Sequence, residues 1–176
     1  MNLSPRQLHH DGLVEQVTGA LEASGLPASS LVLEITEGAM MHDTEATVAK
    51  LADLKALGVR LAVDDFGTGY SSLSYLERFP VDILKIDRAF VVAMESEEDK
   101  SSLARAIVSL AHTLHLQAVA EGVETSAQAD SLAELGCDLA QGYYLARPMS
   151  PEAIEELLSL EPAPGVAGEL SAAARS

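Results

Sequence analysis

Acidic side chains recur at the ends of short apolar runs along this chain, with one lysine and one amide among them. Such carboxylates cannot stay ionised together in a closed pocket unless cations neutralise them. Oxygen ligands favour hard ions such as Mg²⁺ or Mn²⁺ over zinc, and a pair of such ions suits in-line displacement at phosphorus. The residues that form this pattern are Glu34, Glu37, Asp64, Asp65, Lys85, Asp87, Glu121, Glu124 and Gln141.

The members of this pattern differ in how strongly they indicate function. Asp64 and Asp65 are adjacent acids between an apolar run and a loop that contains two glycines, which favours a site over a simple helix cap. Lys85 and Glu34 each interrupt an apolar run, where an unpaired charge is costly, so we interpret both as inward functional groups. Glu37 is equally well explained as a helix cap.

The elements that must position these side chains alternate along the chain. Short runs rich in Val, Ile and Leu alternate with segments of helical period, which is typical of βα units and a parallel sheet. We predict strands at 31–35, 60–63, 83–86, 117–120 and 138–140. We predict helices at 13–23, 44–57, 71–78, 99–114, 126–135 and 151–160.

This arrangement favours an α/β barrel. Functional groups lie at the carboxyl ends of parallel strands, so five strands direct polar groups to one edge. An open doubly wound sheet would do the same, but the regular alternation and the lack of a Gly-rich nucleotide fingerprint favour the barrel.

Composition bounds the remaining possibilities. The 176 residues and 48% hydrophobic content predict one globular domain over 1–160, followed by a disordered C-terminal tail at 161–176. The net charge of −16 argues against nucleic-acid partners. With one cysteine, no signal peptide pattern and no apolar run long enough to span a bilayer, we expect a cytoplasmic chain, and a membrane-anchored parent protein stays open.

Several motifs resemble one family in order and spacing. They lie at 33–37 (Leu-Glu-Ile-Thr-Glu), 64–73 (Asp-Asp-Phe-Gly-Thr-Gly-Tyr-Ser-Ser-Leu), 85–87 (Lys-Ile-Asp), 120–124 (Ala-Glu-Gly-Val-Glu) and 141–143 (Gln-Gly-Tyr). Together they resemble the EAL family, and Asn2-Leu3-Ser4 is similar to that family's strand-end Asn-x-Ser. The resemblance covers residues 2 to about 160.

The resemblance implies a modified TIM barrel that, with Mg²⁺ or Mn²⁺, opens cyclic di-GMP to linear pGpG in bacterial second-messenger signalling. Carried over by position, Asn2, Glu34 and Asp64 would hold one metal ion. Asp64 would be shared between this ion and a second one, which Asp65 and Glu121 would also bind. Asp65 would also contact the substrate.

The resemblance also implies roles for the surrounding residues. Lys85 would orient the attacking water, so Lys85, Asp64 and Glu121 are the expected catalytic set. Gln141 would lie at the second metal ion and the nucleotide. Glu124 would support the wall of the site that Gln141 forms. The loop that Glu37 would anchor includes Phe66, Gly67, Thr68 and Gly69, and in this family it couples dimerisation to metal binding. We therefore expect a homodimer for the complete domain, and an upstream sensor or GGDEF-type domain in a longer parent.

One departure from the family pattern is large. The Glu-Ala-Leu tripeptide, whose glutamate is a metal ligand, occurs nowhere in the chain. The family places it on a strand before Asn2, so we expect roughly the first two of eight strands to be missing. The length agrees with this expectation, since the chain has 176 residues and a complete barrel of this kind has about 250. The leading hypothesis is thus a metal-dependent phosphodiesterase with impaired turnover. The alternative is a non-catalytic cyclic di-GMP-binding or regulatory module.

Overall fold

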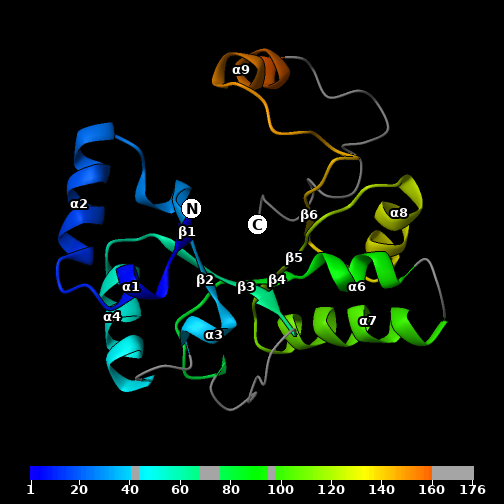
Figure 1. Ribbon diagram of the computed structural model, residues 1–176, viewed down its shortest axis with the longest axis horizontal. Helices are drawn as coiled ribbons and strands as arrows, with labels where there is room; N and C mark the ends of the chain where they lie inside the picture. The colour runs from blue at the N-terminus through cyan, green and yellow to red at the C-terminus, as the bar shows by residue number, and fades with distance from the viewer. Residues whose placement is uncertain (41–43, 68–75, 95–97, 160–176) are drawn as a thin grey trace.

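A single parallel sheet forms the centre of the molecule (Figure 1). The computed structural model describes residues 1–40, 44–67, 76–94 and 98–159. Within them the strands pair side by side in chain order, all in parallel. The strands are β1 (Asn2–Leu3), β2 (Val32–Thr36), β3 (Arg60–Phe66), β4 (Ile83–Ile86), β5 (Gln117–Ala120) and β6 (Leu139–Ala140).

Among the described residues, helices follow β1, β2, β4, β5 and β6 in sequence, and most of them flank the sheet in Figure 1, whereas α9 stands apart from it. The N-terminal half contributes α1 (Pro5–Leu8), α2 (Leu13–Ser24), the 3₁₀ turn η1 (Ala28–Ser30), α3 (Glu37–Met40) and α4 (Thr44–Ala56). The C-terminal half contributes α6 (Arg88–Ala93), α7 (Glu98–Thr113), α8 (Ser126–Glu134) and α9 (Pro151–Ser159). Within the described residues, the predicted alternation of strands and helices is confirmed except between β3 and β4, where the predicted helix at 71–78 lies mostly outside them.

The two faces of the sheet differ because side chains alternate along each strand. One set of alternate residues is fully or almost fully buried and joins the hydrophobic core with residues of the helices. This set comprises Leu33, Ile35, Leu61, Val63, Leu84, Ile86, Ala118 and Ala120. The other face carries Glu34, Asp64 and Lys85, so the strands present their polar side chains away from the helix-covered face.

Local signals explain where several helices begin and end. Ser4 and Thr125 each start a helix with a capping box, in which the side chain accepts the backbone N–H of a glutamine three residues on. Helix α2 ends at Gly25, which adopts a left-handed φ of 67°.

Two aspartates tie neighbouring strands together at their amino ends, away from the polar rim. Asp82, just before β4, accepts the backbone N–H of Leu61 at 2.8 Å and pairs with Lys55 at 2.5 Å. Asp138, just before β6, accepts the N–H of Ala118 at 2.7 Å and contacts His112 at 3.0 Å. In both cases a carboxylate joins one strand to its neighbour and to a side chain of a helix.

The predicted boundaries needed small corrections. Strand β3 runs to Phe66 rather than to Val63, so Asp64 and Asp65 lie inside a strand. The short helices α1, α3 and α6 were not predicted, because four to six residues are too few to show a helical period. The predicted helix at 71–78 lies mostly outside the described residues. The predicted tail at 161–176 lies entirely outside them.

Within the described part of the chain, β1 and β6 are not hydrogen-bonded to each other, so the six strands form an open sheet. Among the helices described there, none is both long and apolar enough to cross a membrane.

Candidate metal centre

Lys85 lies at the centre of the polar rim, on β4. Its ammonium nitrogen is 2.9 Å from Glu34 Oε1, 2.9 Å from Asp64 Oδ1 and 2.5 Å from Glu121 Oε1. The Lys85 side chain is only 6% exposed. The predicted convergence of these side chains at one rim is found, and in addition three carboxylates from separate parts of the sheet surround the buried Lys85 ammonium.

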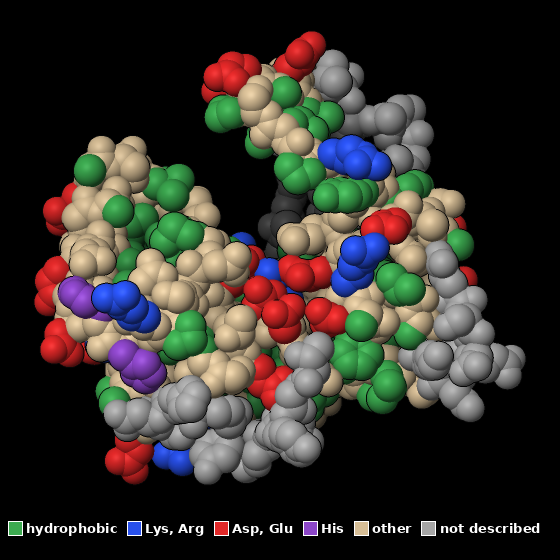
Figure 2. Space-filling model, viewed as in Figure 1, with side chains coloured by type: hydrophobic (Ala, Val, Ile, Leu, Met, Phe, Trp, Pro, Cys, Tyr) green, Lys and Arg blue, Asp and Glu red, His purple; other side chains and the backbone are tan. Residues whose placement is uncertain are grey.

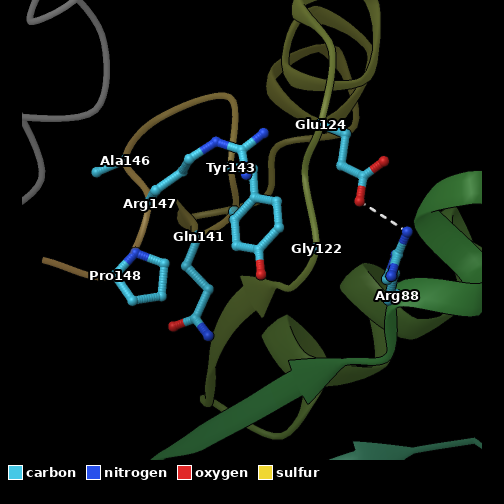
Figure 3. Close-up of a pocket in the computed structure, with 9 residues that line it drawn as sticks. Arg88, Gly122, Glu124, Gln141, Tyr143, Ala146, Arg147 and Pro148 are labelled. Atoms are coloured by element: carbon cyan, nitrogen blue, oxygen red, sulfur yellow. Dashed lines mark ion pairs between the residues drawn. The ribbon is translucent and has the colours of Figure 1, made fainter.

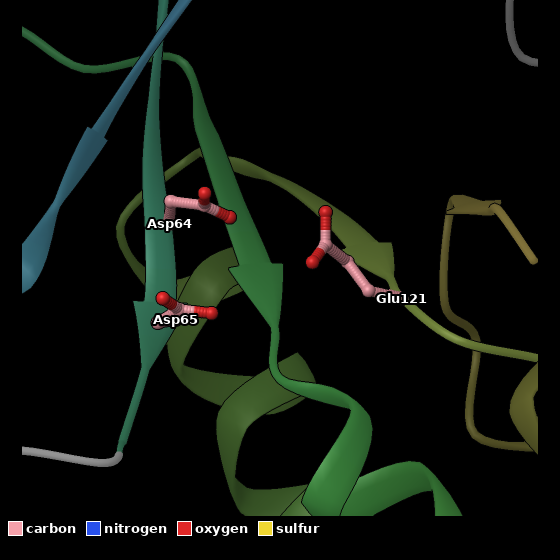
Figure 4. Close-up of side chains that lie close together, drawn as sticks. All are labelled: Asp64, Asp65 and Glu121. Atoms are coloured by element: carbon pink, nitrogen blue, oxygen red, sulfur yellow. The ribbon is translucent and has the colours of Figure 1, made fainter. Parts of the chain in front are cut away.

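Three carboxylates also approach one another closely. Asp64, Asp65 and Glu121 each offer an oxygen, and these oxygens all lie within 4.8 Å of one another. Figure 4 shows Asp64 and Asp65 on β3 facing Glu121, which follows β5. Three like charges at this spacing repel unless cations lie between them, and an oxygen-only donor set suits Mg²⁺ or Mn²⁺. The residues present thus fit a divalent cation.

The backbone of β3 brings two adjacent acids to the same place. In a regular strand Asp64 and Asp65 would point to opposite faces. Asp65 instead has a φ of 54°, in the left-handed region that Asp tolerates better than most residues, and the pairing of β3 with β4 shifts register between Val63 and Phe66. Such irregularities re-aim side chains near functional sites, and here both carboxylates reach the rim.

The electrostatics reflect burial and crowding. Burial opposes the charge of Lys85, but its hydrogen bonds to Glu121, Asp64 and Glu34 outweigh that effect and raise its pKa. Burial raises the pKa of Glu121, against the lowering effect of Lys85. Burial, followed by the charges of Asp64 and Asp87, raises the pKa of Asp65. Burial, together with neighbouring carboxylates, therefore disfavours the charged forms of Asp65 and Glu121.

Gln141 and Asn2 were both predicted to lie at this rim. The Gln141 side-chain N–H donates to Glu121 Oε1 at 3.2 Å, so the amide and the carboxylate are in contact. Asn2 lies on β1 opposite Glu34 in the strand register, which puts it at the edge of the sheet beside a rim carboxylate.

Glu37 contacts the backbone of Gly67, the residue that follows β3. This glutamate is buried at 6% exposure, and its Oε2 accepts the backbone N–H of Gly67 at 3.2 Å. Phe66 is buried, and Gly67 has a φ of 93° with the Phe90 ring 3.0 Å from where a Cβ would stand. Thr68 and Gly69, the other predicted loop residues, lie outside the described residues.

A pocket of about 430 Å³ adjoins the rim (Figure 3). Arg88 pairs with Glu124 at 2.7 Å on one side, and the Arg147 guanidinium lies 4.6 Å from the centre of the Tyr143 ring on the other. Gln141 lines the pocket as well as contacting the rim. The sequence reasoning missed Arg88, Tyr143 and Arg147 as lining residues, although the Gln-Gly-Tyr segment signalled their neighbourhood.

Figure 2 shows a cluster of acidic side chains at the centre of this face, with a hollow beside it, and further acidic side chains along the edges. A parallel sheet whose carboxyl ends present carboxylates, one buried lysine and an adjoining pocket defines an α/β protein whose oxygen-only donor set fits a divalent cation.

The comparison with known proteins agrees with this class. The family model described as "EAL domain" matches residues 1–148, so the chain belongs to the EAL family. The bifunctional diguanylate cyclase/cyclic di-GMP phosphodiesterase MucR of Pseudomonas aeruginosa is 49% identical over 152 residues, which cover 86% of this chain and 22% of MucR. The chain thus spans about a fifth of the length of that relative.

Solved structures give the same result. The complex of PaMucR phosphodiesterase with c-di-GMP superposes with a TM-score of 0.83 at 48% identity, over 87% of this chain and 62% of that one. The manganese and cyclic di-GMP complex of Klebsiella pneumoniae BlrP1 gives a TM-score of 0.75 at 34% identity, over 81% of this chain and 37% of that one. The predicted fold class is confirmed: the open sheet is part of a TIM-type EAL barrel.

Proposed function

We propose that this chain carries the catalytic rim of a metal-dependent phosphodiesterase that opens cyclic di-GMP to linear pGpG. The observation that supports this most is the convergence of Asp64, Asp65 and Glu121 around Lys85 at the carboxyl end of the sheet. The family membership supports it as well, since MucR is named as a cyclic di-GMP phosphodiesterase and PaMucR was solved with c-di-GMP.

The divalent cations would be held by the rim carboxylates. In this proposal Asn2, Glu34 and Asp64 hold one ion, and Asp64, Asp65 and Glu121 hold the other. Bound Mg²⁺ or Mn²⁺ supplies Lewis acidity toward the phosphate oxygens and lowers the pKa of water. The manganese in the BlrP1 complex makes Mn²⁺ the first ion to test.

The side chains of the chain itself position the reactants. Lys85 would donate a hydrogen bond to the attacking water and stabilise negative charge at phosphorus. The water oxygen bonds to phosphorus as the water gives up a proton, the bond from phosphorus to the 3′ oxygen breaks, and the 3′ oxygen takes up one proton in balance, which leaves a 5′-phosphate on pGpG. Asp65 and Gln141 would contact the substrate, and Gln141 also orients Glu121 through its 3.2 Å hydrogen bond.

Supporting residues act on the walls of the site. Glu124, paired with Arg88, would stabilise the pocket wall. Glu37 would hold Phe66 and Gly67 in the loop that continues through Thr68 and Gly69. We further propose that the complete domain dimerises, that a sensor or GGDEF-type domain accompanies it in a longer parent, and that it acts in the cytoplasm.

The second candidate function is a non-catalytic module that binds cyclic di-GMP and regulates a partner. The absence of a Glu-Ala-Leu tripeptide from the 176 residues favours it, because the family's first metal ion would lack one charged ligand. This candidate predicts binding of cyclic di-GMP without release of pGpG.

Purified protein incubated with cyclic di-GMP and Mn²⁺ separates the two functions. We expect slow, Mn²⁺-dependent formation of pGpG that stops in excess chelator. Calorimetric binding of cyclic di-GMP with no pGpG after prolonged incubation would favour the regulatory module instead.

A further inference from the structure

The ammonium nitrogen of Lys85 lies within 2.9 Å of an oxygen from each of three carboxylates. An ammonium carries three N–H groups and no acceptor. Its three partners are Glu34, Asp64 and Glu121, at distances of 2.5 to 2.9 Å. With its side chain 6% exposed, Lys85 has little access to water, so these contacts define its environment.

Two of these partners are also members of the close carboxylate cluster. The oxygens that face Lys85 are Asp64 Oδ1 and Glu121 Oε1. Asp64 and Glu121, with Asp65, are the residues whose oxygens come within 4.8 Å of one another. Lys85 therefore supplies positive charge to the same carboxylates that fit a divalent cation.

We propose that Lys85 is an internal counter-ion that stabilises the rim without divalent cation and opposes divalent cation binding. Lys85 holds Asp64 and Glu121 in place against their mutual repulsion, and it gives up part of these contacts when the carboxylates bind a cation. The inference deepens the proposed function, because it rests on the rim being a divalent-cation site.

This role predicts two effects of opposite sign when the charge of Lys85 is removed. The metal-free fold loses stability, because three partly buried carboxylates lose their only cationic contact among the described residues. Affinity for divalent cation rises, because a positive charge that repels the cation at short range is gone. A lysine that acted only in packing would lower stability and affinity together.

The test compares Lys85→Met with a matched variant, Lys55→Met. Lys55 also forms an ion pair with an aspartate, Asp82, at 2.5 Å, but at the opposite ends of the strands. Each protein is melted in chelator and then titrated with Mn²⁺ by calorimetry. We expect Lys85→Met to melt roughly 5 °C lower in chelator and to bind Mn²⁺ about tenfold more tightly. Lys55→Met should melt lower with a Kd within about twofold of wild type.

A second measurement uses the wild-type protein and does not depend on the variant folding. The side-chain ¹⁵N signal of the Lys85 ammonium, assigned with Lys85→Arg, is followed during titration with Mg²⁺, which is diamagnetic. We expect ammonium protons that exchange slowly with water in chelator, and a signal that shifts as Mg²⁺ saturates the site. The Lys55 signal should stay constant.

The outcomes separate this inference from the proposed function. The counter-ion role is overturned if Lys85→Met binds Mn²⁺ no more tightly than wild type, or if the Lys85 ¹⁵N signal does not shift in saturating Mg²⁺. Either result is still compatible with the metal site. No Mn²⁺ or Mg²⁺ binding by wild type or Lys85→Met overturns the metal-dependent function, and the counter-ion role with it.

Discussion

Lys85 Nζ lies 2.5 Å from Glu121 Oε1, and this contact joins β4 to the end of β5 at the rim. Gln141 donates to the same oxygen from beyond β6 at 3.2 Å. Glu121 is thus placed by a cation on one side and an amide on the other, although no two of these residues are adjacent in sequence. The rim is a single network, and a change at one member should alter the others.

Asp64→Asn should remove most of the stability that the protein gains from Mn²⁺. A cation that binds only the native state stabilises it by about 2.7 kcal/mol at a hundredfold excess over Kd. The substitution keeps the size of the side chain but removes a charge from the cluster of Asp64, Asp65 and Glu121. Thermal melting with and without Mn²⁺ measures the gain. Equal shifts in wild type and Asp64→Asn would show that the ion binds elsewhere.

Glu37→Gln should loosen the start of the loop after β3. The buried carboxylate accepts the Gly67 N–H, and charge-assisted hydrogen bonds contribute roughly 1.5 to 3 kcal/mol. We expect faster hydrogen exchange at Gly67. We also expect weaker Mn²⁺ binding, because Asp64 and Asp65 lie in β3 just before Gly67. Glu45→Gln, at an exposed position of α4, is the matched control. Unchanged exchange at Gly67 would exclude an anchoring role for Glu37.

Asp82→Asn should lower the free energy of unfolding by about 1 to 3 kcal/mol without changing the Kd for Mn²⁺. Asp82 ties β3 to Lys55 at the amino ends of the strands, away from the rim. Denaturant titration measures stability, and calorimetry measures affinity. Asp53→Asn, exposed on α4, should change neither. A marked loss of Mn²⁺ affinity in Asp82→Asn would contradict this separation of the two ends.

Cys137 should make the protein less stable at alkaline pH. Burial raises the pKa of its thiol to about 11, whereas an exposed thiol in the unfolded chain ionises near 8.5. The stabilising contribution is therefore fully present below about pH 8.5 and is lost as pH rises toward 11, by roughly 2 to 3 kcal/mol. The measurement is the difference in unfolding free energy between wild type and Cys137→Ala across that range. A difference that does not change with pH would show that the thiol ionises normally in the folded protein.

Much of the site could be predicted from the sequence, because polar residues that interrupt or follow apolar runs must meet at one edge of a parallel sheet. This reasoning located Glu34, Lys85 and Glu121. It could not show how Asp64 and Asp65 reach the same side, since that depends on a left-handed backbone at Asp65 and a register shift between neighbouring strands. Nor could it find the Arg88–Glu124 ion pair, which joins the first residue of α6 to the segment that follows β5.

The short elements and the strand-tying aspartates were missed for related reasons. Helix α6 has six residues and is marked mainly by its cap, Asp87, whose Oδ1 accepts the N–H of Ala89 at 2.7 Å. Asp82 and Asp138 act through backbone groups of another strand, and no sequence period records such contacts. Local patterns therefore predicted the elements, whereas contacts between them required the three-dimensional arrangement.

The central claim, metal-dependent opening of cyclic di-GMP, is tested most directly by a single assay of pGpG release. Wild type, Asp64→Asn and the matched control Asp53→Asn are incubated with cyclic di-GMP in Mn²⁺ and in chelator. A complete EAL domain that includes the Glu-Ala-Leu strand runs in parallel. We predict release by wild type and Asp53→Asn only with Mn²⁺, more slowly than by the complete domain, and none above background by Asp64→Asn. Release by Asp64→Asn at the wild-type rate, or undiminished release in chelator, would contradict the account.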